Sequence, residues 1–452
     1  MPVSYRLTFS SYLPSSLTST QKTQFTFKHV KHSFLFFSPP KTYPIFISLS
    51  KINCIRSSIM EDFAQFNPTI FESTKDNYSN ELDVAVKAVQ MACSLCQRVQ
   101  KSLLSKSTSL VQSKDDNSLV TIADWSVQAT VSWVLTESFG SNNVSIVAEE
   151  DVETLSKPEA SGLLESVVQT VNECLSEAPQ FGIKGPIIPL KKAEVLEAIR
   201  QCNFNGGPSG RFWVLDPVDG TLGFVRGDQY AVALALVEDG EVVLGVLGCP
   251  NYPLRKEWLS YHHRYYRIIS KLTPPTSISW DKGFVLYAKK GSGKAWMQPL
   301  IPSNNLVWLK SPRPVYVSSI EDPGQATFCE PVERANSSHS FTAGLAHSVG
   351  VRKEPLRVYS MVKYAAVARG DAEIFMKFAR SGYKEKIWDH AAGTVIIQEA
   401  GGVVTDAGGN PLDFSNGIYL EGLDRGIIAC AGVQLHEKIV RAVDASWDSS
   451  CL

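Results

Sequence analysis

Acidic side chains recur in this sequence at the points where short apolar runs end or helical runs begin. The sites are Asp124, the pair Glu149-Glu150, the segment Asp216-Pro217-Val218-Asp219-Gly220-Thr221, and Asp389. Carboxylates gathered in one place repel one another unless a cation lies between them. Oxygen ligands with no nearby His or Cys cluster favour Mg²⁺ over zinc. Two such ions about 3.5–4 Å apart can hold a phosphate, activate water and stabilise a leaving oxygen.

The Asp216–Thr221 segment carries the most specific of these signals. Two Asp residues three positions apart can face one site, and the Val218 carbonyl between them can serve as a further ligand. Gly220 and Thr221 then open a helix or tight turn whose N–H groups suit a phosphate. A strand that ends in a polar turn is the alternative interpretation, and the three other carboxylate sites disfavour it.

Apolar periodicity predicts the elements that must position these residues. The N-terminal part reads as α+β, with helices followed by a β-meander that includes a hairpin around Asp239-Gly240. In the C-terminal part strands and helices alternate, which is typical of α/β layering. We expect helices at 81–104, 124–139, 361–368, 389–399 and 435–447, helix and loop over 157–210, and strands at 119–122, 144–148, 212–215, 230–237, 242–248, 357–359, 372–377 and 402–405. No pattern assigns residues 254–280. The expected domains are 60–312 and 313–452.

Three segments resemble motifs of the inositol-monophosphatase superfamily of Mg²⁺-dependent, lithium-sensitive phosphatases, in the same order and over about residues 80–445. They are Val147-Ala148-Glu149-Glu150, Asp216–Thr221 and Trp388-Asp389-His390-Ala391-Ala392-Gly393. Residues 116–124, 359–364 and 384–390 are most similar to the 3′(2′),5′-bisphosphate nucleotidases, particularly their plant branch. The resemblance implies a layered αβαβα sandwich. It also implies hydrolysis of adenosine 3′,5′-bisphosphate (PAP) to AMP and phosphate, and activity on 3′-phosphoadenylyl sulfate as well.

The resemblance further implies a role for each matching residue. The metal ligands for two or three Mg²⁺ ions would be the side chains of Glu149, Asp216, Asp219 and Asp389 with the carbonyl of Val218. Asp124 and Thr221 would activate the attacking water, and Glu150 would contact the metal ligands without binding the metal itself. The residues that would contact substrate are Thr221, Asn336, Ser360, Lys363, Lys377 and Asp389.

The nucleotide pocket departs from the family pattern at two contact positions. Lys377 stands where the nucleotidases usually carry Arg, and Asn336 where they carry His. A Lys keeps the charge but loses bidentate phosphate geometry. The choice among PAP, 3′-phosphoadenylyl sulfate and inositol phosphates therefore stays open. The alternatives are an inositol mono- or polyphosphate phosphatase on the same scaffold and a non-catalytic nucleotide- or metal-binding sensor.

Charge and composition bear on compartment and partners. Residues 1–59 contain seven Lys and Arg and no Asp or Glu, and Ser and Thr outnumber Arg. This pattern favours a transit peptide or disordered leader, and a chloroplast over a mitochondrion; a start at Met60 would instead leave a cytoplasmic protein. The formal charge of −1 argues against a nucleic-acid polymer as partner. No apolar run reaches the roughly 18 residues of a membrane span. We expect a small nucleotide substrate, with oligomeric state undetermined.

Nine cysteines in so long a chain do not indicate a disulfide framework. Cys93 and Cys96 lie inside an amphipathic helical run with no second pair. We therefore expect two buried thiols one helical turn apart rather than a metal or redox site.

Overall fold

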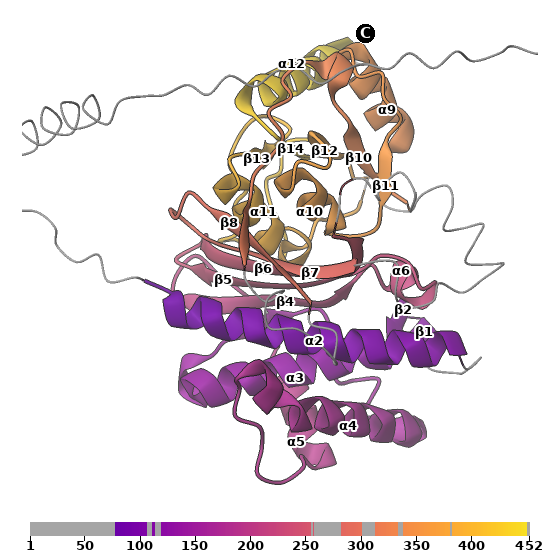
Figure 1. Cartoon of the computed structure of the whole chain (residues 1–452), viewed down its shortest axis with the longest axis vertical. Helices are drawn as coiled ribbons and strands as arrows, with labels where there is room; N and C mark the ends of the chain where they lie inside the picture. Colours follow the sequence, from indigo (N-terminus) through magenta and orange to yellow (C-terminus); the bar gives the residue numbers. More distant parts are fainter. Residues whose placement is uncertain are drawn as a thin grey trace, which may run out of the picture. The chain divides into compact units, whose positions relative to one another are not determined.

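The computed structural model describes residues 77–105, 111–113, 119–254, 256, 282–300, 312–332, 338–379 and 382–449. They all belong to one compact unit that spans residues 75–452. Figure 1 shows five layers in this unit: helices, a sheet, helices, a second sheet and a last pair of helices. This is the αβαβα sandwich that the family resemblance implied. None of the helices described here has the length and apolar character that a bilayer crossing requires.

The first layer consists of four helices: α2 (Ser79–Ser105), α3 (Ile122–Phe139), α4 (Ser161–Ser176) and α5 (Lys192–Arg200). Helix α2 packs against the sheet through a stripe that includes Ala85, Val89 and Ala92. Helix α3 is buried from Ile122 to Leu135, with Trp133 half-buried, because α2, α4, α5 and the sheet surround it. Cys93 and Cys96 of α2 are fully buried thiols, as predicted.

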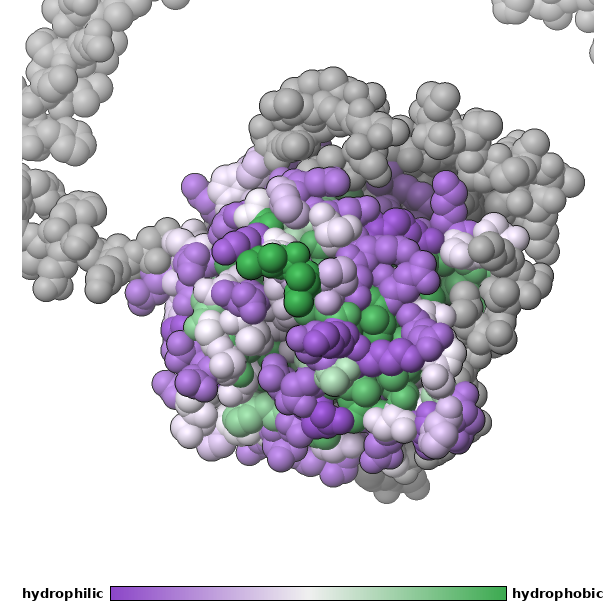
Figure 2. Space-filling model, turned by 90° about the horizontal axis from the view of Figure 1, so that it is seen from below, coloured by the Kyte–Doolittle hydropathy of each residue, from purple (hydrophilic) through white to green (hydrophobic). Residues whose placement is uncertain are grey.

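The outer face of this layer is mostly hydrophilic. Figure 2 shows it from below, with small hydrophobic areas between the polar side chains. Ile187 and Ile188, in the loop before α5, are two exposed apolar residues of this region. Three short 3₁₀ turns connect the elements here: η1 (Ser141–Asn143), η2 (Pro158–Ala160) and η3 (Ala178–Phe181).

The larger sheet has seven strands in the order β3-β4-β5-β6-β7-β8-β9. The strands are β3 (Ile146–Ala148), β4 (Arg211–Asp219), β5 (Ala231–Glu238), β6 (Glu241–Pro253), β7 (Lys282–Lys289), β8 (Ala295–Pro299) and β9 (Arg313–Val315). Strand β3 runs parallel to β4, and all the other pairs are antiparallel. The predicted hairpin is β5–β6, and φ is positive at both Asp239 and Gly240, as a two-residue hairpin turn of type I′ requires. A separate small ribbon pairs β1 (Val111–Ser113) with β2 (Leu119–Thr121).

The smaller sheet has five strands in the order β11-β10-β12-β14-β13. Its strands are β10 (Phe328–Pro331), β11 (Leu356–Val358), β12 (Ile374–Lys377), β13 (Val403–Asp406) and β14 (Ile427–Cys430). Strand β10 is parallel to both neighbours, whereas β14 is antiparallel to both of its own. The expected alternation of strands and helices is therefore present. Strands β10 and β14 have four residues each and show no polar alternation, so the sequence pattern does not predict them.

Helices cover both faces of the smaller sheet. α10 (Val362–Ala368) and α11 (Ala391–Glu399) lie between the two sheets, and α9 (His339–Ser348) and α12 (Val433–Ser449) form the outermost layer. Two further 3₁₀ turns are η6 (Pro323–Gln325) and η7 (Ile387–Asp389). The chain passes from the larger sheet to the smaller one between β9 and β10. The expected domain boundary at residue 312 stays a prediction.

Helix α11 approaches its neighbours more closely than a side chain would allow. A Cβ atom on Gly245 of β6 would lie 2.6 Å from the carbonyl oxygen of Ala392. On the other side of the helix, a Cβ atom on Gly393 would lie 2.3 Å from Cγ of Tyr364 in α10. These two glycines therefore fix α11 between β6 and α10.

Candidate active site

A β-bulge in β4 brings Asp216 and Asp219 to the same side of the sheet. Asp216 pairs with Ala233 of β5 and Asp219 pairs with Ala231, so three steps along β4 oppose two steps along β5. In a regular strand, residues three apart point to opposite faces. The extra residue reverses that alternation, so both carboxylates face the pocket.

The turn after Asp219 packs tightly against a second turn that precedes α10. Gly220 has φ of +89°, and a Cβ atom there would lie 2.8 Å from Cβ of Ser360. Ser360 itself has φ of +57°, a strained conformation for a residue with a side chain. The amide of Met361 donates to Oδ2 of Asp219 at 2.5 Å. The two turns therefore hold each other and set the position of Asp219.

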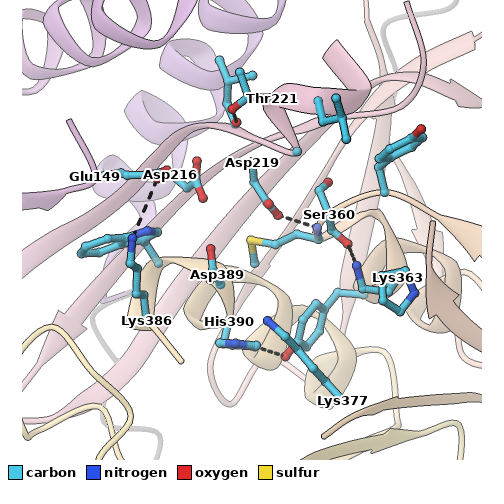
Figure 3. Close-up of a pocket in the computed structure, with 18 of the residues that line it drawn as sticks. Glu149, Asp216, Asp219, Thr221, Ser360, Lys363, Lys377, Lys386, Asp389 and His390 are labelled. Carbon is cyan, nitrogen blue, oxygen red and sulfur yellow. Dashed lines mark hydrogen bonds and ion pairs between the residues drawn. The ribbon is translucent and has the colours of Figure 1, made fainter. Parts of the chain in front are cut away.

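Four carboxylates from three segments meet at this edge of the sheet. Glu149 follows β3, whose residue Ala148 pairs with Leu215, so Glu149 lies beside Asp216. Asp389 ends the turn η7 (Ile387–Asp389). Asp216, Asp219 and Asp389 each offer an oxygen within 4.8 Å of the others. Figure 3 shows the four side chains converging around one space.

Asp216 and Asp219 ionise less readily than usual in this pocket, and a bound cation would favour their ionised forms. Burial, and then the negative charges of Glu149, Asp219 and Asp389, raise the pKa of Asp216 well above its usual range. Loss of hydration and the nearby Asp389 raise the pKa of Asp219 to about 7. In the described part of the chain, Oδ1 of Asp216 is buried without a hydrogen-bond partner. A set of anionic oxygens with an unpartnered buried member fits a hard divalent cation such as Mg²⁺.

Three lysines line the same pocket. Nζ of Lys363 donates to the carbonyl oxygen of Ser360. Lys386 lies 4.0 Å from Oε1 of Glu149, and its Nζ is 5.1 Å from the centre of the Trp388 ring. Lys386 was not among the predicted site residues, although it lies three residues before Asp389 in the segment 384–390, which is similar to the nucleotidases. The pocket therefore combines an acidic cluster with an ammonium-lined wall, an arrangement that suits a phosphorylated ligand.

The third lysine belongs to a buried network. Nζ of Lys377 is 2.6 Å from Oε2 of Glu385, and Nε2 of His390 is 3.0 Å from the same oxygen. Burial alone would raise the pKa of Glu385, but Lys377 and His390 hold it at about 2. On the other side of the imidazole, the hydroxyl of Tyr364 is 2.7 Å from Nδ1 of His390.

The space between these groups measures about 470 Å³, which is within the range of small-molecule sites. Aromatic side chains provide its apolar surface, including Tyr359, Phe375 and Trp388. The predicted site residues that line it are Glu149, Asp216, Val218, Asp219, Thr221, Ser360, Lys363, Lys377 and Asp389. Asn336 lies outside the described residues.

Asp124 and Thr221 have other hydrogen-bond partners in this structure. Oδ2 of Asp124 accepts from the amide and the hydroxyl of Thr121, each at 2.7 Å, as the third residue of a capping box at the start of α3. The Thr221 hydroxyl donates to the Val218 carbonyl at 3.2 Å. Asp124 is nonetheless near enough to Asp216 to raise its pKa. The catalytic pairing of Asp124 and Thr221 stays a prediction.

Comparison with known proteins identifies the family. The sequence model of the inositol monophosphatase family matches residues 79–448. The chain belongs to the inositol monophosphatase family. Among family members it is similar to the 3′(2′),5′-bisphosphate nucleotidases, as the sequence motifs predicted.

Two curated relatives and one solved structure illustrate the similarity. The 3′,5′-bisphosphate nucleotidase AHL of Arabidopsis thaliana is 63% identical over 377 residues, which are 83% of this chain and 99% of that protein. A 3′(2′),5′-bisphosphate nucleotidase of Oryza sativa is 44% identical over 81% of this chain and 94% of its own length. The extragenic suppressor protein suhB from Bartonella henselae aligns with 81% of this chain and 98% of its own, with a TM-score of 0.49 and 20% identity.

Proposed function

We propose that this inositol monophosphatase family member is a Mg²⁺-dependent phosphatase that hydrolyses the 3′-phosphate of PAP to give AMP and phosphate. One observation carries the proposal: a buried acidic cluster and three lysines line a single pocket. The names of the two plant relatives support the nucleotide as substrate. Activity on 3′-phosphoadenylyl sulfate is part of the same proposal because that molecule carries the same 3′-phosphate.

The acidic cluster would hold the metal. Asp216, Asp219, Asp389 and Glu149 would supply carboxylate oxygens, and Val218 its carbonyl. Bound Mg²⁺ would neutralise the phosphate oxygens and acidify the attacking water. Asp124 and Thr221 would orient that water and accept its proton. In the same pocket, Lys363 and Lys377 would bind the second anionic group of the nucleotide, with the ammonium groups acting as point charges.

The first test is phosphate release from PAP by the purified full chain, with Mg²⁺ and then with EDTA. We expect release that depends on Mg²⁺. Release from inositol phosphates but not from PAP would instead assign the chain to the inositol phosphate phosphatases. If neither substrate releases phosphate while Mg²⁺ still binds, the chain would instead be a non-catalytic nucleotide- or metal-binding sensor.

Two variants extend this test to the catalytic roles. Asp124→Asn and Thr221→Ala should lower kcat at least about a hundredfold, the contribution usual for proton transfer by a positioned group. Both should still bind AMP in calorimetry. The matched control is Thr170→Ala, which removes a hydroxyl that donates to the Ser166 carbonyl on α4 and should leave kcat unchanged. Near-normal turnover in either active-site variant would refute its role.

We also propose that the chain is imported into the chloroplast. The support is the acid-free, Ser- and Thr-rich composition of residues 1–59 and a family match that begins only at residue 79. Residues 1–60 fused to a fluorescent reporter should direct it to plastids in leaf cells. A mitochondrial signal, or a diffuse cytosolic one, would contradict the proposal.

A further inference from the structure

The buried carboxylate of Glu385 lies behind Lys377, one of the three lysines that line the pocket. Glu385 is 4% exposed and does not itself line the cavity. Three side chains that do line it, Lys377, His390 and Tyr364, are linked to Glu385 directly or through one another. Figure 3 shows Lys377 and His390 beside Asp389, on the side of the pocket away from Thr221. Glu385 therefore contacts the pocket through these side chains.

The chemistry of the donors sets the direction of each hydrogen bond. An ionised carboxylate can only accept, so the Nε2 atom of His390 must carry a hydrogen and donate it to Oε2 of Glu385. In the uncharged imidazole, Nδ1 is then an acceptor, and the hydroxyl of Tyr364 donates to it at 2.7 Å. The tautomer of His390 thus follows from the position of Glu385.

The same carboxylate uses only one of the three N–H donors of Lys377. A free lysine side chain has four rotatable bonds and loses conformational entropy when a ligand immobilises it. The contact of 2.6 Å with Glu385 immobilises it before any ligand arrives. Within the described residues the Lys377 ammonium makes no other hydrogen bond, so its remaining donors can meet an anionic group of the substrate in the pocket.

A cation at Glu385 is a different interpretation of the same atoms. Glu385, Asp389 and His390 offer ligand atoms within 4.8 Å of one another. However, the Lys377 ammonium already contacts Oε2 of Glu385, and the imidazole nitrogens of His390 both have partners. In the described part of the chain, Oε1 of Glu385 is buried without a hydrogen-bond partner, but a metal ion bound there with His390 as a ligand would have to break one of the two hydrogen bonds of the imidazole. The contacts therefore favour a positioning role.

We propose that Glu385 is a positioning and specificity-determining residue, which fixes the Lys377 ammonium and the Nε2–H tautomer of His390 so that the pocket selects substrates with a second anionic group. The proposal rests on the proposed function, because it takes Lys377 as a contact to the nucleotide. It predicts that Glu385 acts on binding of that second group and not on the bond-breaking step.

The test compares PAP with 3′-AMP, which lacks the second phosphate, in the full-length protein. In Glu385→Gln, which keeps the size of the side chain but removes its charge, we expect KM for PAP to rise about tenfold with kcat within twofold of wild type. The kinetics of 3′-AMP should be unchanged. The conservative variant Glu385→Asp should recover part of the loss. Glu421→Gln, which alters an exposed carboxylate paired with Lys384, is the matched control and should match wild type.

Two measurements do not depend on turnover. Calorimetry with AMP in EDTA should show about tenfold weaker binding to Glu385→Gln than to wild type. The ¹⁵N spectrum of wild-type protein with labelled histidine should show the Nε2–H form for His390, even if no variant folds. If PAP is not hydrolysed, the proposed function fails while these two measurements still decide the role of Glu385.

Three outcomes would overturn the proposal. Equal loss of kcat on PAP and 3′-AMP with unchanged KM would show that Glu385 acts at the metal cluster instead. If Glu385→Gln has wild-type kinetics and wild-type affinity for AMP, Glu385 has only a structural role. An Nδ1–H tautomer at His390 would contradict donation from its Nε2 atom to Glu385 and so refute the positioning role.

Discussion

Asp219 experiences opposing influences from its neighbours in the pocket. Its carboxylate accepts a backbone hydrogen bond from Met361, which favours the ionised form, as does the positive charge of Lys363. Poor hydration and the charge of Asp389 outweigh both, and they raise its pKa to about 7. The metal-free protein therefore holds a proton at this site over a pH range in which the unfolded chain has lost it.

This difference predicts how stability changes with pH. Because the folded state binds more protons than the unfolded state between pH 4 and 7, stability of the metal-free protein falls as pH rises through that range. Asp219→Asn removes this contribution. In EDTA, its Tm relative to wild type should therefore increase by a few degrees from pH 4.5 to pH 8. Mg²⁺ should raise the Tm of wild type more than that of the variant, since binding stabilises the folded state. A Tm difference independent of pH would refute the assignment.

At the scale of elements, α11 connects the packing of the core to the site. The helix begins at Ala391, two residues after Asp389, so its position determines where that carboxylate lies. Gly245 and Gly393 allow it to touch β6 and α10 at backbone distance. A side chain at either glycine would force the helix away from its neighbour.

Gly245→Ala tests this coupling. The added methyl would lie 2.6 Å from both the Ala392 carbonyl and Cγ1 of Val395, and relief of such a clash costs about 1–3 kcal/mol. We expect lower stability in urea together with reduced phosphate release. The control Gly162→Ala places a methyl in α4 with no heavy atom within 4 Å and should leave stability unchanged or raise it by up to about 1 kcal/mol. Wild-type stability in Gly245→Ala would show that the helix adjusts freely.

Much of the fold and of the candidate site could be predicted from the sequence, because the signals for them lie within short segments. The segment Asp216–Thr221 predicts the end of a strand, a turn and a pair of carboxylates within six residues. The bulge in β4 could not be predicted, since it exists only in the register with β5. The link from Lys377 to Glu385 and His390 depends on two segments that meet only in the folded chain.

At the scale of the whole molecule, Arg369 joins the two halves of the sandwich. It follows α10, pairs with Asp371 at 3.1 Å, and donates to the carbonyl of Pro253 at the end of β6. Its guanidinium also lies 4.7 Å from the ring centre of Phe284 in β7. One buried cation thus links the helices between the sheets to the larger sheet.

The bulged strand and the turn before α10, described above as holding each other, also bear on the order in which the molecule forms. Asp219 and Met361 are 142 residues apart in the chain, and contacts of such long range close late and slowly during folding. The larger sheet can acquire its strands before this contact exists, but the pocket cannot. Catalytic competence should therefore be the last property to return when the denatured chain refolds.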